Sequence, residues 1–174
     1  MGRAGGRRRP VVIAAVAVSC VLVAVGLYWF EPWKLWQERT VSEALPSATA
    51  SAAAGQAPRT LTRGSLISHE HTTTGTARTV RLPDGSRVLR LEGLDTSNGP
   101  DLRVWLTDAP VKEGTAGWYV FDDGKHLSLG SLKGNKGDQN YPIPAGADLS
   151  EYSSVTIWCD RFDVSFGAAA LRPV

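Results

Sequence analysis

The chain has 174 residues with 19 basic and 17 acidic side chains, so it has room for one ordinary domain and short additions. The basic excess belongs to the N-terminal end, because from Thr60 onward 12 Lys and Arg stand against 14 Asp and Glu. This balance excludes a basic surface for nucleic acid, and no nucleic-acid partner is predicted.

The first predicted element is a transmembrane helix over Val11–Phe30, a run without a charged side chain or a proline. A helix of this length spans about 30 Å of hydrocarbon. Arginines precede the run and Tyr-Trp-Phe ends it, which is typical of a helix whose N-terminal side is cytoplasmic. A cleavable signal peptide is the alternative, but the aromatic ending followed by Glu-Pro is a poor cleavage site. We therefore expect a single-pass signal anchor in the cell membrane, with the basic tail 1–10 in the cytoplasm and the domain outside.

The segment 31–59 is predicted to connect this anchor to the folded domain. Residues 31–45 suit a short juxtamembrane helix that starts at Pro32, with two tryptophans three positions apart on one face. The stretch 46–58 contains mainly Ala, Ser and Pro without periodicity, which indicates a flexible spacer. The folded domain is therefore expected to occupy residues 60–174.

The folded domain has the pattern of an all-β protein. Short runs alternate apolar and polar residues, as in Leu102–Leu106, and turn signals separate them at short, even spacing. Leu82–Ser86 predicts a tight hairpin, and Asp148 is expected to cap one helical turn. The sequence therefore predicts an antiparallel β-sandwich of about 8–10 short strands, preceded by the transmembrane helix.

The stretch Asp148–Leu171 predicts two adjacent core strands around the domain's one cysteine. Strand side chains alternate between faces, so each run should present one apolar face. The tight link Asp160–Arg161 would join the two strands. The two expected faces are Val155, Ile157 and Cys159, and then Phe162, Val164, Phe166 and Ala168.

Cys159 is the candidate redox residue, and a packed core thiol is the alternative. The other cysteine lies in the predicted membrane helix, so no disulfide forms within the domain. Arg161 is a candidate for lowering the pKa of the thiol. His69 and His71 would point the same way in an extended segment, and with Cys159 they suggest a copper or haem site. No histidine closely follows Cys159 and the domain has no methionine, which counts against blue copper, and the cofactor stays unknown.

Two polar loops are candidate binding sites. Asp95, Asn98 and Asp101 surround a Gly-Pro pair and offer oxygen ligands to Ca²⁺, although ordinary turns use the same residues. The second loop, within 134–140, alternates glycines with polar residues and suits an anion-binding nest or a structural turn. Its candidate residues are Asn135, Asp138 and Asn140.

Several blocks of this sequence resemble the DM-13, or electron-transfer DM, domain family, which also includes the animal protein Skeletor. The resemblance covers about residues 63–171 in one continuous order. It implies a β-sandwich-like fold and a redox role around the cysteine, here Cys159, and in animals and plants the domain accompanies haem-binding and cytochrome modules. The family's early strand typically holds a histidine, which favours His71 as a cofactor-binding residue. The blocks that carry the resemblance are Arg87–Glu92, Asn98–Leu106, Leu132–Tyr141, Val155–Cys159 and Phe166–Ala169.

The expected function is a membrane-anchored, extracytoplasmic redox or electron-transfer module centred on Cys159, with a redox partner protein. The alternative is a binding or adhesion module that meets an envelope component or Ca²⁺ at the two polar loops, without redox activity. A hydrolase is the least expected class, because no nucleophile and base can be paired in the sequence.

Overall fold

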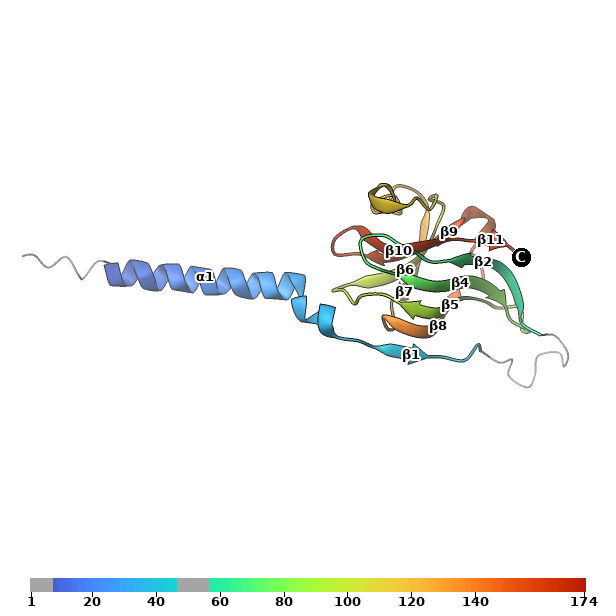
Figure 1. Cartoon of the computed structure of the whole chain (residues 1–174), viewed down its shortest axis with the longest axis horizontal. Helices are drawn as coiled ribbons and strands as arrows, with labels where there is room; N and C mark the ends of the chain where they lie inside the picture. The colour runs from blue at the N-terminus through green and yellow to red at the C-terminus, as the bar shows by residue number, and fades with distance from the viewer. Residues whose placement is uncertain (1–7, 47–56) are drawn as a thin grey trace, which may run out of the picture.

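The computed structural model describes residues 8–46 and 57–174, and Figure 1 shows a long helix that projects from one end of a β-sandwich. The helix α1 spans Arg8–Phe30, and its 22-residue stretch Arg9–Phe30 is long enough and apolar enough to cross a membrane. Most of the predicted basic tail, residues 1–7, and most of the predicted spacer, residues 47–56, lie outside the described residues.

Two packed sheets confirm the predicted antiparallel β-sandwich. The six-stranded sheet has the order β1-β8-β5-β4-β2-β11, and the five-stranded sheet has the order β3-β10-β9-β6-β7. Every pair is antiparallel except β1 with β8. The strands are β1 (Thr40–Ser42), β2 (Arg59–Ser65), β3 (Ile67–Ser68), β4 (Thr74–Arg81), β5 (Arg87–Asp95), β6 (Leu102–Thr107), β7 (His126–Ser131), β8 (Lys136–Ile143), β9 (Ser154–Cys159), β10 (Val164–Ala170) and β11 (Arg172–Pro173).

The core lies between the two sheets, where alternate side chains of facing strands meet. Its buried members include Leu89, Leu91, Val104, Ile157 and Cys159. A second, smaller cluster lies on the other face of the five-stranded sheet, where Trp105 of β6 and Trp158 of β9 pack with Phe121 from the loop before β7. The central strand β9 is therefore buried on both faces.

The pairing of β9 with β10 is confirmed, but two residues of the expected apolar face lie elsewhere. The reversal between the strands includes Asp163, which adopts a left-handed φ of 50°, so Phe162 belongs to the turn and is 38% exposed. A register shift between Ser165 and Gly167 then moves Ala168 to the opposite face, beside Trp158. The alternation was therefore wrong for Phe162 and Ala168, because a bulge inserts one residue into the period of two.

Both predicted turns are confirmed. In the hairpin between β4 and β5, the Leu82 N–H donates to the Ser86 carbonyl, and Gly85 supplies the positive φ of 83° that the turn requires. The Asp148 side chain accepts a hydrogen bond from the Ser150 N–H at the start of the short 3-10 helix η3 (Leu149–Glu151).

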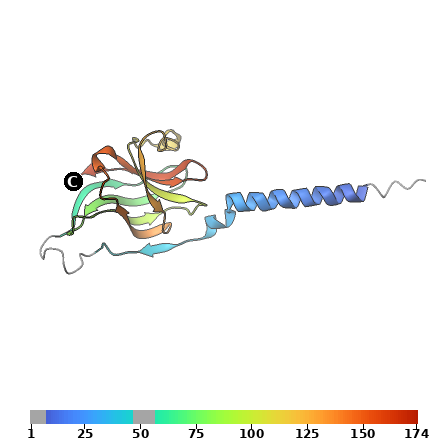
Figure 2. The ribbon, with the colours of Figure 1, turned by 180° about the vertical axis from the view of Figure 1, so that it is seen from behind.

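The juxtamembrane segment, residues 31–45, begins a helical turn at Pro32 as expected, but the helix ends at Trp36 and does not continue through the segment. After the 3-10 helix η1 (Pro32–Trp36), the chain extends and forms β1, which pairs in parallel with β8. Both views of the ribbon show β1 along the edge of the sandwich next to β8 (Figures 1 and 2). Hydrogen-bond partners on β8 favour the extended conformation over a helix that would have no such partners.

Candidate functional site

Cys159 ends β9 at the end of the sandwich that faces α1. Its side chain is 0% exposed, and its Cα pairs with Val164 on one side and Leu102 on the other. Burial raises the pKa of the thiol, although backbone N–H groups of Arg161, Phe162 and Asp101 act in the opposite direction. The sulfur is therefore a protonated thiol at neutral pH, not an activated thiolate.

Arg161, a candidate for lowering the pKa of the thiol, directs its guanidinium to the anchor instead. Its Nη1 atom donates to the Trp29 carbonyl at 2.8 Å and to the Tyr28 carbonyl at 3.3 Å. Its guanidinium also lies 5.5 Å from the centre of the Trp29 ring. Because the last carbonyls of a helix lack partners within the helix, Arg161 stabilises the C-terminal end of α1.

The two histidines of the Ser-His-Glu-His run do not form a pair of ligands. His69 is buried, its Nε2–H donates to the Lys112 carbonyl at 3.0 Å, and its Nδ1 accepts from the Ser165 hydroxyl at 2.7 Å. Burial lowers the pKa of His69, so its ring is neutral and structural. His71 instead pairs with the Glu70 carboxylate, and its ring lies against Phe166.

The residues that the structure describes do not assemble a copper site. Among them, no three His, Cys, Asp or Glu side chains come close enough to hold a metal ion. Both ring nitrogens of His69 already have partners, and Cys159 is fully covered, which leaves a haem iron no open path to its sulfur.

The side chains of the first polar loop bind groups of the loop itself and of the juxtamembrane segment. Asn98 accepts from the Gly99 N–H at 2.9 Å and donates to the Gln37 carbonyl at 3.4 Å. Asp101 binds Arg103 through both carboxylate oxygens, at 2.9 and 3.2 Å. Asp95 lies at the far end of the loop, 3.8 Å from the Lys136 ammonium. These three candidate residues do not converge on one point.

The second polar loop holds the juxtamembrane strand. Asn135 accepts from the Arg39 N–H at 2.7 Å, and Asn140 donates to the Ala44 carbonyl at 2.8 Å. Asp138 contributes its backbone carbonyl, which accepts from the Glu43 N–H at 3.0 Å. We call this site the strand-docking slot and define it as Lys133, Gly134, Asn135, Gly137 and Asn140, which contact residues 39–44.

Two glycines allow the strand to come close to the slot. A Cβ atom on Gly134 would lie 2.4 Å from the Arg39 carbonyl oxygen, and one on Gly137 would lie 2.1 Å from the Val41 carbonyl oxygen. Both separations are shorter than any real contact, so a side chain at either position would displace the strand. Gly137 also has a φ of 92°, which other residues rarely adopt.

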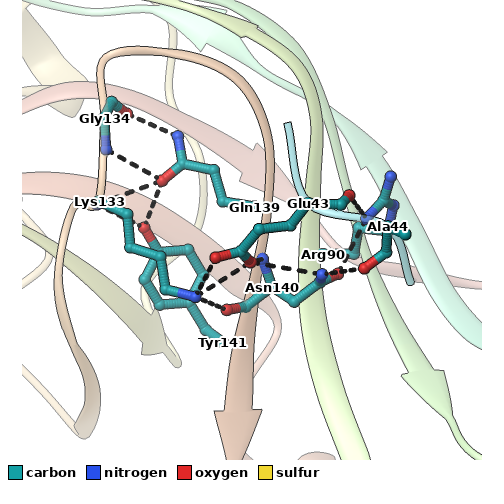
Figure 3. Close-up of polar contacts among 8 residues, drawn as sticks. All are labelled: Glu43, Ala44, Arg90, Lys133, Gly134, Gln139, Asn140 and Tyr141. Atoms are coloured by element: carbon teal, nitrogen blue, oxygen red, sulfur yellow. Dashed lines mark hydrogen bonds and ion pairs between the residues drawn. The ribbon is translucent and has the colours of Figure 1, made fainter. Parts of the chain in front are cut away.

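An ion pair at the centre of the slot fixes Glu43 (Figure 3). The Lys133 Nζ atom lies 2.8 and 3.0 Å from the two carboxylate oxygens of Glu43, and the Asn140 N–H donates to the same carboxylate at 2.8 Å. The Lys133 hydrogen bond, followed by the Asn140 N–H, holds the pKa of Glu43 below its ordinary value.

Buried side chains shape the turn that carries Lys133 and Gly134. Gln139 is fully buried, its Oε1 accepts from the Tyr141 hydroxyl at 2.7 Å, and its Nε2 donates to the Gly134 carbonyl at 2.6 Å. The Tyr141 hydroxyl in turn accepts from the Lys133 N–H at 3.0 Å. Burial raises the pKa of Tyr141 to about 12, so this hydroxyl stays protonated and keeps donating to Gln139.

The slot and the Cys159 strand both fall within a stretch that matches a known family. Residues 65–171 match the family described as electron transfer DM13. The chain belongs to the electron-transfer DM13 family. Neither a curated protein nor a solved structure matches the chain in the corresponding searches. The juxtamembrane segment lies outside the DM13 domain in sequence, yet it fills the slot that the domain provides.

Several residues of the slot and its surroundings were not identified from the sequence. Glu43 lies in the segment predicted to be helical, and it is the distant partner of both Lys133 and Arg90. Gln139 binds residues close to it in sequence, Gly134 and Tyr141, through a side chain whose burial the polar pattern of the loop does not indicate. The available signal was the pair of glycines at 134 and 137 between polar residues. In an exposed edge strand such a pair indicates close approach of another backbone.

The lowered pKa of Glu43 predicts that strand docking depends on pH. Because the docked pKa is depressed, the charge stabilises docking above the ordinary pKa of 4.5, and this stabilisation is lost as the pH falls through the docked pKa. We expect Glu43→Gln to lower the free energy of unfolding by about 1 kcal/mol at neutral pH and to leave it unchanged in acid. Urea denaturation at a series of pH values measures this difference. Glu113→Gln, at an exposed position without an ion pair among the described residues, should show no such trend. A constant difference between wild type and Glu43→Gln at every pH would contradict the assignment.

Proposed function

We propose that this chain is an electron-transfer module, held outside the cytoplasm by one transmembrane helix, with the Cys159 sulfur as its redox-sensitive group. The family assignment supports the electron-transfer role in general terms. The specific assignment to Cys159 rests on one observation. It is the one cysteine of the DM13 domain, and it lies at the base of the turn that contacts the end of α1.

The surroundings of Cys159 suit a buried redox group better than a nucleophile. The thiol is protonated and shielded from water, which disfavours direct attack on a substrate and leaves electron exchange through the protein as the role that its position allows. On the opposite face of β9, Trp158 stacks on Trp105 at 5.2 Å, and Trp105 stacks on the exposed His126 at 4.2 Å. This stack connects the strand that carries Cys159 to the protein surface, where a redox partner protein can dock.

The membrane topology in this proposal follows from charge and apolarity. The apolar side chains of α1 are exposed along its length, as expected of a helix that is covered by lipid. The arginines before α1 favour a cytoplasmic N-terminus. The DM13 domain then lies at the outer surface of the cell membrane.

Substitution of Cys159 tests the proposal. The full chain, purified in detergent from its native membrane, should exchange electrons with soluble mediators in a potentiometric titration, and Cys159→Ser should abolish the exchange. Cys20→Ser, at the chain's other cysteine, should retain it. An absorption spectrum recorded alongside separates a bound chromophore from the thiol alone.

Two results would refute the Cys159 assignment: a wild-type chain that exchanges no electrons, or a Cys159→Ser chain that exchanges as many as wild type. Circular dichroism of both serine variants checks the fold, because a hydroxyl in this apolar environment costs about 1–3 kcal/mol.

The binding or adhesion alternative rests on the two polar loops and stays a prediction. Asn135 and Asn140 already bind the juxtamembrane segment, and Asp138 binds Arg90 and the Gly93 N–H. No observation on these loops favours a second ligand over the segment that they hold.

A further inference from the structure

A cavity lies where the anchor meets the DM13 domain. Its volume is about 490 Å³, within the range of small-molecule sites. Phe30, the last residue of α1, lines it together with residues of η1 and its N-cap. The remaining lining residues come from the loops after β3, before β6 and before β7, from the turn after β9 and from β10. The cavity therefore opens at the level where α1 would leave the membrane.

Aromatic rings form a large part of the walls, because five of the 13 lining residues are Phe, Trp or Tyr. Phe162 stacks on Phe30 with ring centres 5.6 Å apart, which joins the domain to the end of the anchor. Trp118, Tyr119 and Phe166 line the same space. Aromatic walls of this kind favour a flat, unsaturated ligand, because rings stack on rings in offset or edge-to-face arrangements.

A carboxylate–histidine pair supplies the polar side of the cavity. Glu70 and His71 both line it, and the His71 Nε2 atom pairs with the Glu70 carboxylate. With a proton on Nε2, the Nδ1 atom is a hydrogen-bond acceptor, and it has no partner among the described residues. Such a pair accepts a proton from a ligand hydroxyl on Nδ1 while the carboxylate stabilises the resulting imidazolium.

A second polar group in the cavity wall lacks a partner. The Trp118 Nε1 atom is buried without a hydrogen-bond partner among the described residues. Lys34, by contrast, already has two partners, because its ammonium binds the Glu31 carboxylate at 2.7 Å and the Pro100 carbonyl at 3.0 Å. The cavity therefore combines aromatic walls with few polar groups and has no unpaired cation to bind an anionic headgroup.

We infer that this cavity binds the headgroup of a membrane quinol or quinone. The headgroup is a flat ring with oxygens at opposite edges, which suits aromatic walls. A quinol hydroxyl can donate to the His71 Nδ1 atom, and a quinone carbonyl can accept from the Trp118 Nε1–H. Its hydrocarbon tail would lie along the exposed apolar surface of α1. This inference rests on the proposed electron-transfer function and names its small-molecule carrier.

Fluorescence titration of the full chain in lipid nanodiscs tests the site. A short-chain 1,4-benzoquinone should quench tryptophan emission saturably, with one bound molecule per chain. Loss of the His71 hydrogen bond in His71→Ala should weaken binding of the corresponding quinol about tenfold, whereas His126→Ala should leave it unchanged. His126 is a suitable control because it also stacks on an aromatic ring, outside the cavity.

A blocking variant and a competitor complete the test. Val164→Phe adds a ring to a residue that lines the cavity and should abolish saturable quenching. Three results would overturn the inference: non-saturable quenching by the benzoquinone, equal quinone affinity in wild type and Val164→Phe, or equal quinol affinity in wild type and His71→Ala. Displacement of the quinone by a fatty acid at equal concentration would also overturn it, because the cavity would then be an acyl-chain site.

The two proposals fail separately. If the quinone does not bind while electron exchange still depends on Cys159, the inference about the cavity fails alone. If the quinone binds in the cavity while wild type and Cys159→Ser exchange electrons equally, the role of Cys159 fails and the binding site stands.

Discussion

Replacement of Gly134 by alanine is expected to release the juxtamembrane strand from the DM13 domain. The added methyl group would lie 2.4 Å from the Arg39 carbonyl and 2.8 Å from a methyl group of Val41, so the strand must move away. Its departure breaks the ladder with β8 and leaves Glu43 without Lys133. Gly134 does not have the left-handed φ seen at Gly137, so the substitution blocks the strand without straining the domain's own backbone.

Amide hydrogen exchange measures this release. In Gly134→Ala the Arg39 and Glu43 amides, which are hydrogen-bonded in the wild type, should exchange at least about tenfold faster, a loss of about 1.4 kcal/mol of protection. Amides of β5 should keep their protection. Gly146→Ala is the matched control, since its methyl group meets open space. Unchanged exchange at Arg39 and Glu43 in Gly134→Ala would show that the strand does not need the slot.

The fold could be predicted from the sequence wherever local alternation decides the structure. Val155, Ile157 and Cys159 lie on one face of β9, as a period of two requires. The same rule misplaced Phe162 and Ala168. The left-handed Asp163 carries no Gly or Pro signal, whereas the bulge after Ser165 adjoins Gly167, which the alternation treats as an ordinary strand residue. The local pattern predicts that a strand is present, and tertiary context decides where the strand starts and where its register shifts.

The strand β1 could not be predicted because everything that stabilises it is distant in the sequence. It has three residues, and its partner β8 begins almost a hundred positions later. A three-residue extended segment has no period of its own. The partners of Arg161 could not be predicted either, because they are carbonyl groups at the end of α1 and not groups of the domain.

The slot and the cavity lie at successive points along one segment, which connects their functions. Three residues describe this path in chain order. Phe30 lines the cavity, Lys34 donates a hydrogen bond to the Pro100 carbonyl, and Glu43 pairs with Lys133 in the slot. Phe30 and Lys34 line the cavity themselves, so the position of the segment affects one side of the cavity wall. Release of β1 in Gly134→Ala should therefore also weaken quinone binding.

Replacement of Arg90 by methionine is expected to have the largest effect on stability. Arg90 is 7% exposed and extends from β5 to the juxtamembrane strand, where its Nη1 atom donates to the Glu43 carbonyl at 2.9 Å. The same guanidinium binds Glu92 at 2.9 Å, Asp138 at 2.8 Å and the Asn140 side chain at 3.0 Å. Removal of one partner from a buried charge network leaves the others without compensation, which typically costs 3–5 kcal/mol.

Because Asp138 and Glu92 are partly exposed, we expect Arg90→Met to lower the free energy of unfolding by about 3 kcal/mol, the lower end of that range. Urea denaturation of the full chain in nanodiscs, followed through the buried Trp158, measures the change. Arg78→Met is the matched control: Arg78 also binds Glu92, at 2.7 Å, but it is more exposed and does not reach the juxtamembrane strand, so its loss should cost less than about 1 kcal/mol. If the two variants are equally stable, Arg90 is an ordinary surface arginine, and the strand is held by the slot alone.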